Sequence, residues 1–312
     1  MNVITETNFA GLGEKKRGKV RDIYFQEDKL ILVATDRHSS FDRIIAHIPH
    51  KGAVLNLSSA FWFNETADIV PNHVIAVPDP NVTVAKRVKP LAVEAVVRGY
   101  LTGTTSTSIW TRYQAGERKF GGLTLPGGLK KNTRLPRPIF DPTTKEDTHD
   151  RALSLKELVD EGFIDALRLE ELHKTALALF ARGQDVAAQH GLLLVDTKYE
   201  FGVDEKGKLT LIDEIHTPDS SRYWKRGSYE ARLAEGKEPE YFDKEFLRIW
   251  FRDHCDPYKD KVLPEAPPDM VTELTRRYIE IYQQLTGQVF SVDVAVPPLE
   301  RIEKNLAAYR VG

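Results

Sequence analysis

The fold is decided by residues 192–202, which read LLLVDTKYEFG, and by residues 209–215, which read LTLIDEI. Both runs are apolar and rich in residues that favour strands. The DEKG segment at 204–207 is turn chemistry, because Gly207 can take a positive φ. The pattern therefore predicts a β-hairpin. If Val203 faces Lys208, antiparallel pairing sets Lys198 opposite Asp213 and Glu200 opposite Leu211.

One face of this predicted hairpin mixes apolar and charged side chains. Side chains alternate between the two faces of a strand, so this face carries Leu192, Leu194, Asp196, Lys198, Glu200, Leu209, Leu211 and Asp213. A core face does not normally hold four charges, nor a solvated face four leucines. One interpretation is a weak salt bridge at a sheet margin. The other is a cleft wall where carboxylates hold magnesium and a lysine meets phosphate.

Several separate blocks, in order, resemble one enzyme family. Residues 194–202 resemble the second signature of the SAICAR synthetases, and Asp213-Glu214 followed by TPDSSR at 217–222 resembles the family's next block. The resemblance runs from Gly18 to about Arg248, and the chain length suits the longer, yeast-like form. It implies an ATP- and magnesium-dependent ligase of purine biosynthesis. Such an enzyme joins CAIR, the carboxyaminoimidazole ribonucleotide, to L-aspartate, giving SAICAR, ADP and phosphate.

The resemblance also implies roles for the charged hairpin residues. Glu200 and Asp213 would hold magnesium and Lys198 would stabilise phosphate, which makes these three the predicted catalytic residues. Phosphorylation of the CAIR carboxylate would give an acyl phosphate, which the aspartate amine attacks. Two rival functions remain. One is a small-molecule kinase or another carboxylate–amine ligase on the same scaffold, and the other is a nucleotide-binding regulatory protein without turnover.

A second part of the predicted ATP site lies near the N-terminus. Residues 13–20 fit the first seven letters of a Walker A loop, but Val20 stands where Ser or Thr should bind magnesium. We reject that interpretation. Gly18, Lys19, Val20 and Arg21 instead enter a hairpin that places both basic groups on one face. An ordinary exposed hairpin has this pattern too, but the family resemblance implies that it covers the nucleotide.

Lys145 is the remaining residue of the predicted ATP site. It ends DPTTK at 141–145, which resembles the family's Ser-Pro-(Ser/Thr)-Thr-Lys segment with Asp141 in place of Ser. The resemblance assigns Lys145 to the nucleotide phosphates or the reacting carboxylate. The alternative is a solvated loop, in which these residue types are common.

Substrate-binding residues follow from further blocks. RGYLTGT at 98–104 offers a guanidinium, hydroxyls and exposed backbone for an anion. It resembles the family's first signature, with Ala92 and Thr104 replacing the usual Pro and Ser. Residues 243–248, DKEFLR, resemble a helix of the family, and the resemblance implies that Arg248 reaches the ribose 5-phosphate. The predicted set is Ser40, Asp42, Arg98, Thr104, Asp219, Ser220, Arg222 and Arg248.

Composition sets the cellular context. The chain has 312 residues and a formal net charge of -2, which gives no general attraction to nucleic acid or an anionic membrane. Its one cysteine, Cys255, excludes an internal disulfide and fits a reducing compartment. The first residues lack the apolar core that is typical of a signal peptide, and no run approaches the roughly 20 apolar residues that a membrane span needs. We expect a cytoplasmic protein, and a monomer rather than an oligomer.

The order of patterns predicts an α+β fold. Strands are predicted at 18–25, 29–35, 82–87 and 93–100, with a short helix at 57–64 and an extended connector over the cleft at 121–142. The middle and tail are helical, with predicted helices at 244–252, 268–286 and 298–309. We expect an N-terminal domain at 1–114 and a C-terminal domain at 115–312. The family fold implies two lobes, an antiparallel sheet that covers the nucleotide and a larger ATP-grasp-like domain.

Overall fold

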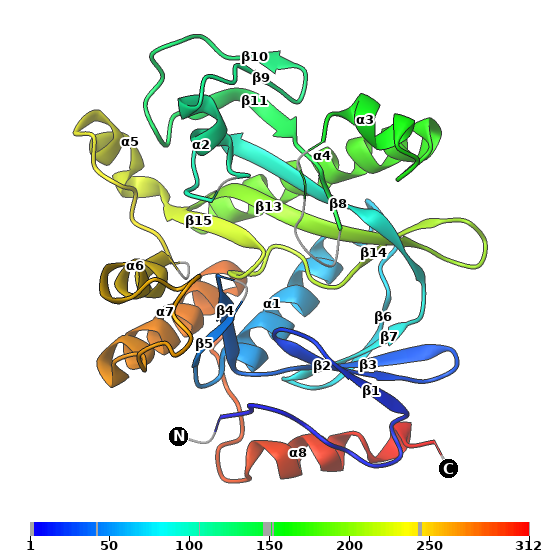
Figure 1. The fold of residues 1–312 in the computed structure, drawn as a ribbon. Coiled ribbons are helices and arrows are strands. Elements are labelled where there is room, and N and C mark those ends of the chain that lie inside the picture. The colour runs from blue at the N-terminus through cyan, green and yellow to red at the C-terminus, as the bar shows by residue number, and fades with distance from the viewer. Residues whose placement is uncertain are drawn as a thin grey trace.

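The computed structural model describes residues 3–41, 43–105, 107–145, 151, 153–242 and 245–311 (Figure 1). Its strands form antiparallel sheets with helices packed around them, which confirms the α+β prediction. None of the described helices is both long and apolar enough to cross a membrane.

Five strands from the first third of the chain form the first sheet. Their spatial order is β1 (Glu14–Arg17), β2 (Arg21–Phe25), β3 (Lys29–Ala34), β7 (Val82–Lys86) and β6 (Val74–Asp79). The predicted hairpin is present, but residues 18–20 form the connection from β1 to β2. Gly18 suits this connection because a Cβ there would lie 2.9 Å from the Arg21 carbonyl oxygen.

Helix α1 (Lys51–Glu65) lies between the two main sheets (Figure 1). Its residues contact β3 and β7, whereas Trp62 and Phe63 belong to the core beneath the second sheet. The predicted helix at 57–64 is the second half of α1. A small hairpin of β4 (Arg37–Ser40) and β5 (Arg43–His47) precedes it.

The second sheet is built around two long strands, β8 (Lys89–Tyr100) and β13 (Leu192–Val203). β11 (Arg134–Phe140) and β12 (Thr143–Thr144) pair with β8, and β14 (Leu209–Ile212) and β15 (Ser221–Lys225) pair with β13. Helix α4 (Ala166–Gln189) covers one face with its apolar stripe. The predicted connector at 121–142 therefore contains a sheet strand, β11.

The division between the sheets differs from the expected domain boundary. β8 precedes residue 114, yet its partners are residues 134–144 and 192–203. The first sheet therefore ends before β8, and the expected division at 114 and 115 does not coincide with it. Sequence order could not show this, because long-range pairing decides which sheet takes up β8.

The β13–β14 hairpin is shifted by one residue from the predicted register. Val203 pairs with Leu209, and Glu200 pairs with Ile212. Asp204 N–H donates to the Lys208 carbonyl at 3.1 Å, which leaves a three-residue loop that ends on Gly207 at φ 77°. The predicted pairing of Lys198 with Asp213 is wrong, since β14 ends at Ile212.

The predicted mixed face of this hairpin is also wrong. The register between β13 and β15 shifts between Leu194 and Asp196, and one extra residue in a strand reverses the alternation of its side chains. Leu192 and Leu194 consequently lie in the core with Tyr199 and Phe201. The β13–β14 register places Leu209 and Leu211 in the same core. Lys198 and Glu200 lie on the opposite face.

The C-terminal helices pack against two different parts of the molecule. α6 (Glu245–His254) and α7 (Pro268–Thr286) pack beside α1, whereas α8 (Pro298–Asn305) and η1 (Ala307–Tyr309) lie beneath the first sheet (Figure 1). The three predicted C-terminal helices are confirmed, with small shifts at their ends. The remaining elements are α2 (Ile109–Gln114), β9 (Lys119–Phe120), β10 (Leu123–Thr124), α3 (Leu155–Asp160) and α5 (Arg226–Ala234).

Candidate active site

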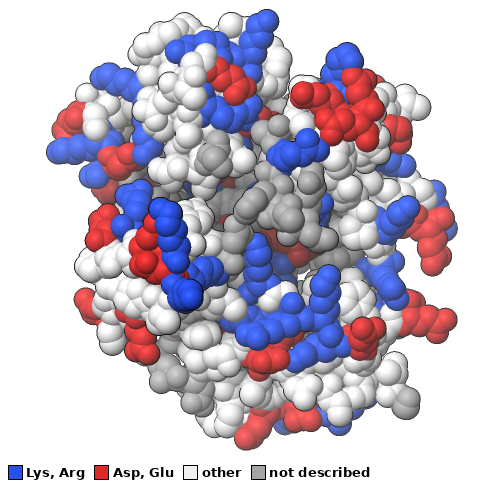
Figure 2. Space-filling model, viewed as in Figure 1, with Lys and Arg blue, Asp and Glu red and all other residues white. Residues whose placement is uncertain are grey.

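A cluster of acids and bases joins the two sheets. Arg21 reaches from β2 in the first sheet to the loop that follows β14 in the second. Its guanidinium forms an ion pair with Asp213, and Nη2 lies 2.8 Å from Glu214 Oε2. Figure 2 shows a hollow on the face seen in Figure 1, with lysine and arginine side chains gathered along its lower rim.

Lys198 stands at the centre of this cluster. Its ammonium lies 2.7 Å from Glu94 Oε1, on the neighbouring strand β8, and 2.9 Å from Glu200 Oε1. The second oxygen of Glu200 pairs with Lys145, which follows β12. Lysines from two segments thus share one carboxylate, an arrangement that suits the recognition of a polyanion.

Burial and charge act against each other in the cluster. Burial alone would lower the pKa of Lys198, but Glu200 and Glu94 outweigh it and raise that pKa above its ordinary value. Burial would raise the pKa of Asp213, but Arg21 and Lys198 outweigh it, so that pKa is lowered. Burial raises the pKa of Glu214 despite Arg21. Asp213 is therefore an anionic oxygen donor at neutral pH.

The connection between β1 and β2 is held in place by hydrogen bonds from Arg37 of β4. This side chain is completely buried and pairs with Asp22 at 2.8 Å. It also donates to the carbonyls of Lys19 and Gly18, at 3.0 Å each. The predicted nucleotide-covering segment is thus fixed by a guanidinium that has little freedom to move.

A tight turn shapes the loop between β14 and β15. Asp213 takes φ 66°, a conformation that is uncommon for non-glycine residues, and this conformation accompanies its pairing with Arg21. The Thr217 hydroxyl accepts from the Asp219 and Ser220 N–H groups at 3.2 Å each. It donates to Glu214 at 2.9 Å. The turn therefore couples Asp219 and Ser220 to the acidic cluster.

Asp219 is anchored by two residues from helices. Lys51, fully buried at the start of α1, lies 2.6 Å from one carboxylate oxygen. Tyr278 of α7 donates to the other at 2.6 Å. The C-terminal helix α7 is in this way tied to the loop that carries Asp213.

A cavity of about 250 Å³ opens near β15, and Thr104 and Arg222 both line it. Gly103 takes φ 102°, and a Cβ at this position would lie 2.5 Å from Ser108 Cβ, so the loop needs glycine here. Arg222 Nη1 lies 2.5 Å from Asp196 Oδ2. Hydroxyl and guanidinium thus face one space, as anion binding requires.

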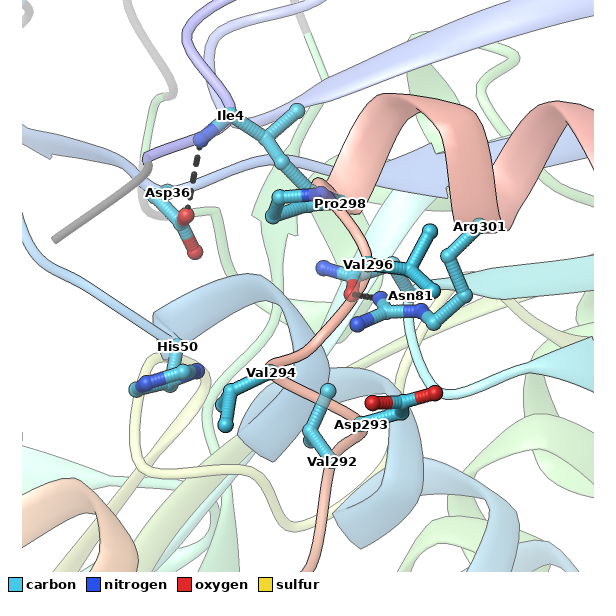
Figure 3. A pocket seen from close by; sticks show the side chains of 10 residues that line it. All are labelled: Ile4, Asp36, His50, Asn81, Val292, Asp293, Val294, Val296, Pro298 and Arg301. Atoms are coloured by element: carbon cyan, nitrogen blue, oxygen red, sulfur yellow. Dashed lines mark hydrogen bonds between the residues drawn. The ribbon is translucent and has the colours of Figure 1, made fainter.

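Another cavity, of about 290 Å³, lies beside the start of α1, where His50 lines it (Figure 3). Asp36 lines it, but its carboxylate accepts from the N–H groups of Ile4 and Gly52. Arg301 also lines it and is engaged by Asp79 and Asn81. The lining combines a single arginine with the carboxylates of Asp36 and Asp293 and is otherwise largely apolar, so this cavity suits a triphosphate less well than the lysine- and arginine-rich cluster does.

The sequence profile of one family matches residues 14–265, and the description of that family is SAICAR synthetase. The chain belongs to the SAICAR synthetase family. It catalyses the joining of CAIR and aspartate to SAICAR, a step of purine biosynthesis.

Relatives agree along almost the whole chain. The phosphoribosylaminoimidazole-succinocarboxamide synthase of Legionella pneumophila (strain Lens) is 55% identical over 304 residues, covering 97% of each chain. The chloroplastic synthase of Arabidopsis thaliana is 51% identical over 309 residues, covering 97% of this chain and 75% of its own.

Solved structures share the fold. A SAICAR synthase from Saccharomyces cerevisiae in complex with SAICAR has a TM-score of 0.80 and 33% identity, covering 93% of this chain and all of its own. A SAICAR synthetase in complex with ADP has a TM-score of 0.69 and 25% identity, covering 89% of this chain and all of its own.

The structure gathers only part of the SAICAR synthetase site predicted from sequence. Arg21, Lys145, Lys198, Glu200 and Asp213 form one cluster, and Thr104 and Arg222 line one cavity.

Other predicted substrate residues lie outside that cavity lining. Arg98 is buried against Asp141 at 2.7 Å and donates to the Thr107 carbonyl, so it supports the loop. Arg248 lies over the Phe41 ring, 5.4 Å from its centroid. Ser40 is buried in β4, and Asp42 lies outside the described residues.

Sequence reasoning missed several residues of the site. Glu94 could have been found, because a carboxylate that stands between Val93 and Ala95 in a buried strand is unusual. Arg37 and Lys51 carried no comparable signal, since only the tertiary structure brings them to Gly18 and Asp219.

Proposed function

We propose that SAICAR forms in the cleft between the two sheets, and that ATP first phosphorylates the CAIR carboxylate. The acyl phosphate then reacts with the aspartate amine and releases phosphate, because phosphate is a far better leaving group than hydroxide. The observation that carries this proposal is the acid–base cluster that Arg21 completes across the two sheets. In such transfers protein groups mainly position reactants and neutralise charge.

The cluster divides into groups for phosphate and for metal. Gly18, Lys19, Val20 and Arg21 would cover the nucleotide, with Lys145 and Lys198 meeting its phosphates. The first sheet is then a nucleotide-covering lobe over a larger ATP-grasp-like lobe. The ADP complex of a relative of the same fold supports this assignment.

Glu200 and Asp213 fit a magnesium ion that arrives with ATP. Within the described ranges, no three acidic, histidine or cysteine side chains are grouped to hold a metal unaided. Magnesium, however, is commonly held by one or two carboxylates together with substrate phosphates. The negative charges of both carboxylates raise the pKa of Lys198, so both carboxylates lie near its ammonium group. A bound magnesium would neutralise charge on the transferring phosphoryl group.

CAIR would bind where Thr104 and Arg222 line the cavity, with Arg98 positioning the loop that carries Thr104. Ser40 and Arg248 would approach from the β4–β5 side, and Asp219 and Ser220 from the turn after β14. Asp42 stays a predicted substrate residue outside the described residues. The SAICAR complex of the yeast relative supports a small-molecule site of this kind. The single cysteine supports a cytoplasmic enzyme, and we propose that it acts as a monomer.

ADP release, measured with each substrate omitted in turn, tests the proposal. We expect continuous ADP release only when CAIR, aspartate, ATP and magnesium are all present, because aspartate must consume the acyl phosphate before the next turnover. ADP formed with CAIR and ATP at the same rate in the absence of aspartate would indicate a kinase. No ADP under any condition would indicate a binding protein without turnover.

Replacement of Thr104 tests the substrate cavity. Thr104→Ser keeps the hydroxyl and should leave CAIR affinity nearly unchanged. Thr104→Val keeps the shape but removes the hydrogen bond, so CAIR binding should weaken by roughly 1–3 kcal/mol. The measurement is the CAIR Kd by calorimetry, with melting temperatures as a control for folding. Wild-type affinity in the Val variant would remove Thr104 from the site.

A further inference from the structure

We propose that Arg252, on α6, binds the 5-phosphate of the ribonucleotide in the cavity that Thr104 and Arg222 line. This inference rests on the proposed function, because it deepens the description of the same substrate site. The family resemblance points to Arg248, one turn earlier, for this helix. The structure places Arg252 in the cavity lining instead.

The geometry of α6 separates these two arginines. Ile249 and Arg252 are three residues apart, so they lie on one side of the helix, and both line the cavity. Arg248 instead stacks over Phe41, which follows β4. Leu247 and Phe251 are buried against α1 and α7, which fixes the rotation of α6 about its axis. Arg252 is therefore held at the cavity by the packing of its own helix.

The charges around the cavity favour an anion at Arg252. Arg222 lies 2.5 Å from Asp196, and Lys131 lies 2.6 Å from Glu238, so each of these bases faces a carboxylate closely. Arg252 Nε lies 3.9 Å from Asp253 Oδ1, and these side chains are 58% and 59% exposed. Such a loose, solvated pair screens little of the guanidinium charge. A phosphate dianion can therefore pair with Arg252 without breaking a strong ion pair.

The site combines the donors that phosphate recognition needs. Thr104, an exposed residue, supplies a hydroxyl, and the preceding Gly103 also lines the cavity. Two guanidiniums, Arg222 from β15 and Arg252 from α6, face the space from different elements. Guanidinium groups bind phosphate oxygens in a bidentate manner, which gives direction as well as charge.

The test compares CAIR with its dephosphorylated nucleoside. For Arg252→Gln, we expect the KM for CAIR to rise roughly tenfold or more, with kcat and the KM for ATP nearly unchanged. With the nucleoside, this variant and the wild type should have the same kcat/KM, because the nucleoside carries no phosphate for Arg252 to bind. Arg252→Lys should recover part of the CAIR affinity. The control is Arg276→Gln, which removes an arginine with a 60% exposed side chain on α7. This variant should leave the KM for CAIR and the KM for the nucleoside unchanged.

Three outcomes would overturn the inference. An unchanged KM for CAIR in Arg252→Gln would show that this side chain does not bind substrate. An equal loss with CAIR and with the nucleoside would show damage unrelated to phosphate. If Arg222→Gln loses the preference for CAIR over its nucleoside and Arg252→Gln keeps it, the phosphate binds in this cavity without a contribution from Arg252. Wild-type turnover of CAIR, aspartate and ATP tests the proposed function separately.

Discussion

Asp213→Asn is expected to keep the fold and to lose turnover by roughly a hundredfold or more. The carboxylate is charged at neutral pH, because Arg21 and Lys198 lower its pKa despite burial. The amide retains nearly the same shape but loses the charge that would hold magnesium near the transferring phosphoryl group. The measurement is kcat at saturating magnesium and substrates, together with the melting temperature.

Glu205→Gln is the matched control for this prediction. Glu205 is an exposed acid in the loop of the same hairpin, and its replacement should leave kcat unchanged. Near-normal kcat in Asp213→Asn, with a melting temperature several degrees lower, would show that Asp213 only forms a structural ion pair with Arg21. That result would contradict the metal assignment.

Arg37→Met is expected to destabilise the protein by roughly 3–5 kcal/mol, because it leaves the buried Asp22 carboxylate without its cation. The carbonyls of Gly18, Lys19 and Thr5 lose a donor as well. The free energy of unfolding, measured by urea denaturation, checks the prediction.

A double variant separates the ion pair from general damage to the core. Replacing both partners, as Arg37→Met with Asp22→Leu, removes the unpaired charge. The combined loss should be smaller than the sum of the two single losses. Additive losses would show that the two side chains contribute independently, which would contradict the role given to this pair.

The sequence predicted the hairpin of β13 and β14 but not its register. The prediction assumed a four-residue loop, whereas Asp204 pairs with Lys208 across a three-residue loop. The bulge near Val195 had no signal in the sequence, because it depends on how β15 pairs with β13. The charged residues nevertheless predicted the cluster correctly. Their grouping requires only that β13 and the loop after β14 lie close together, and it does not depend on the register of the hairpin.

The candidate site was predictable where the residues lie in short, distinctive segments. Lys198 and Glu200 are neighbours on one strand, and the structure places both in the cluster. The position of Arg248 relative to the cavity could not be predicted in this way, because burial of Leu247 and Phe251 sets the rotation of α6 about its axis. A helix position read from sequence does not determine which neighbouring side chain enters a cavity.

The most direct test of the account follows oxygen from CAIR. CAIR labelled with ¹⁸O in both carboxylate oxygens is turned over with ATP and aspartate, and the inorganic phosphate is analysed by mass spectrometry. If the carboxylate attacks the γ-phosphorus, one labelled oxygen passes to phosphate, and the other remains in the amide of SAICAR. The account predicts one ¹⁸O in each phosphate formed. Unlabelled phosphate accompanied by SAICAR formation would contradict phosphorylation of the carboxylate in this cleft.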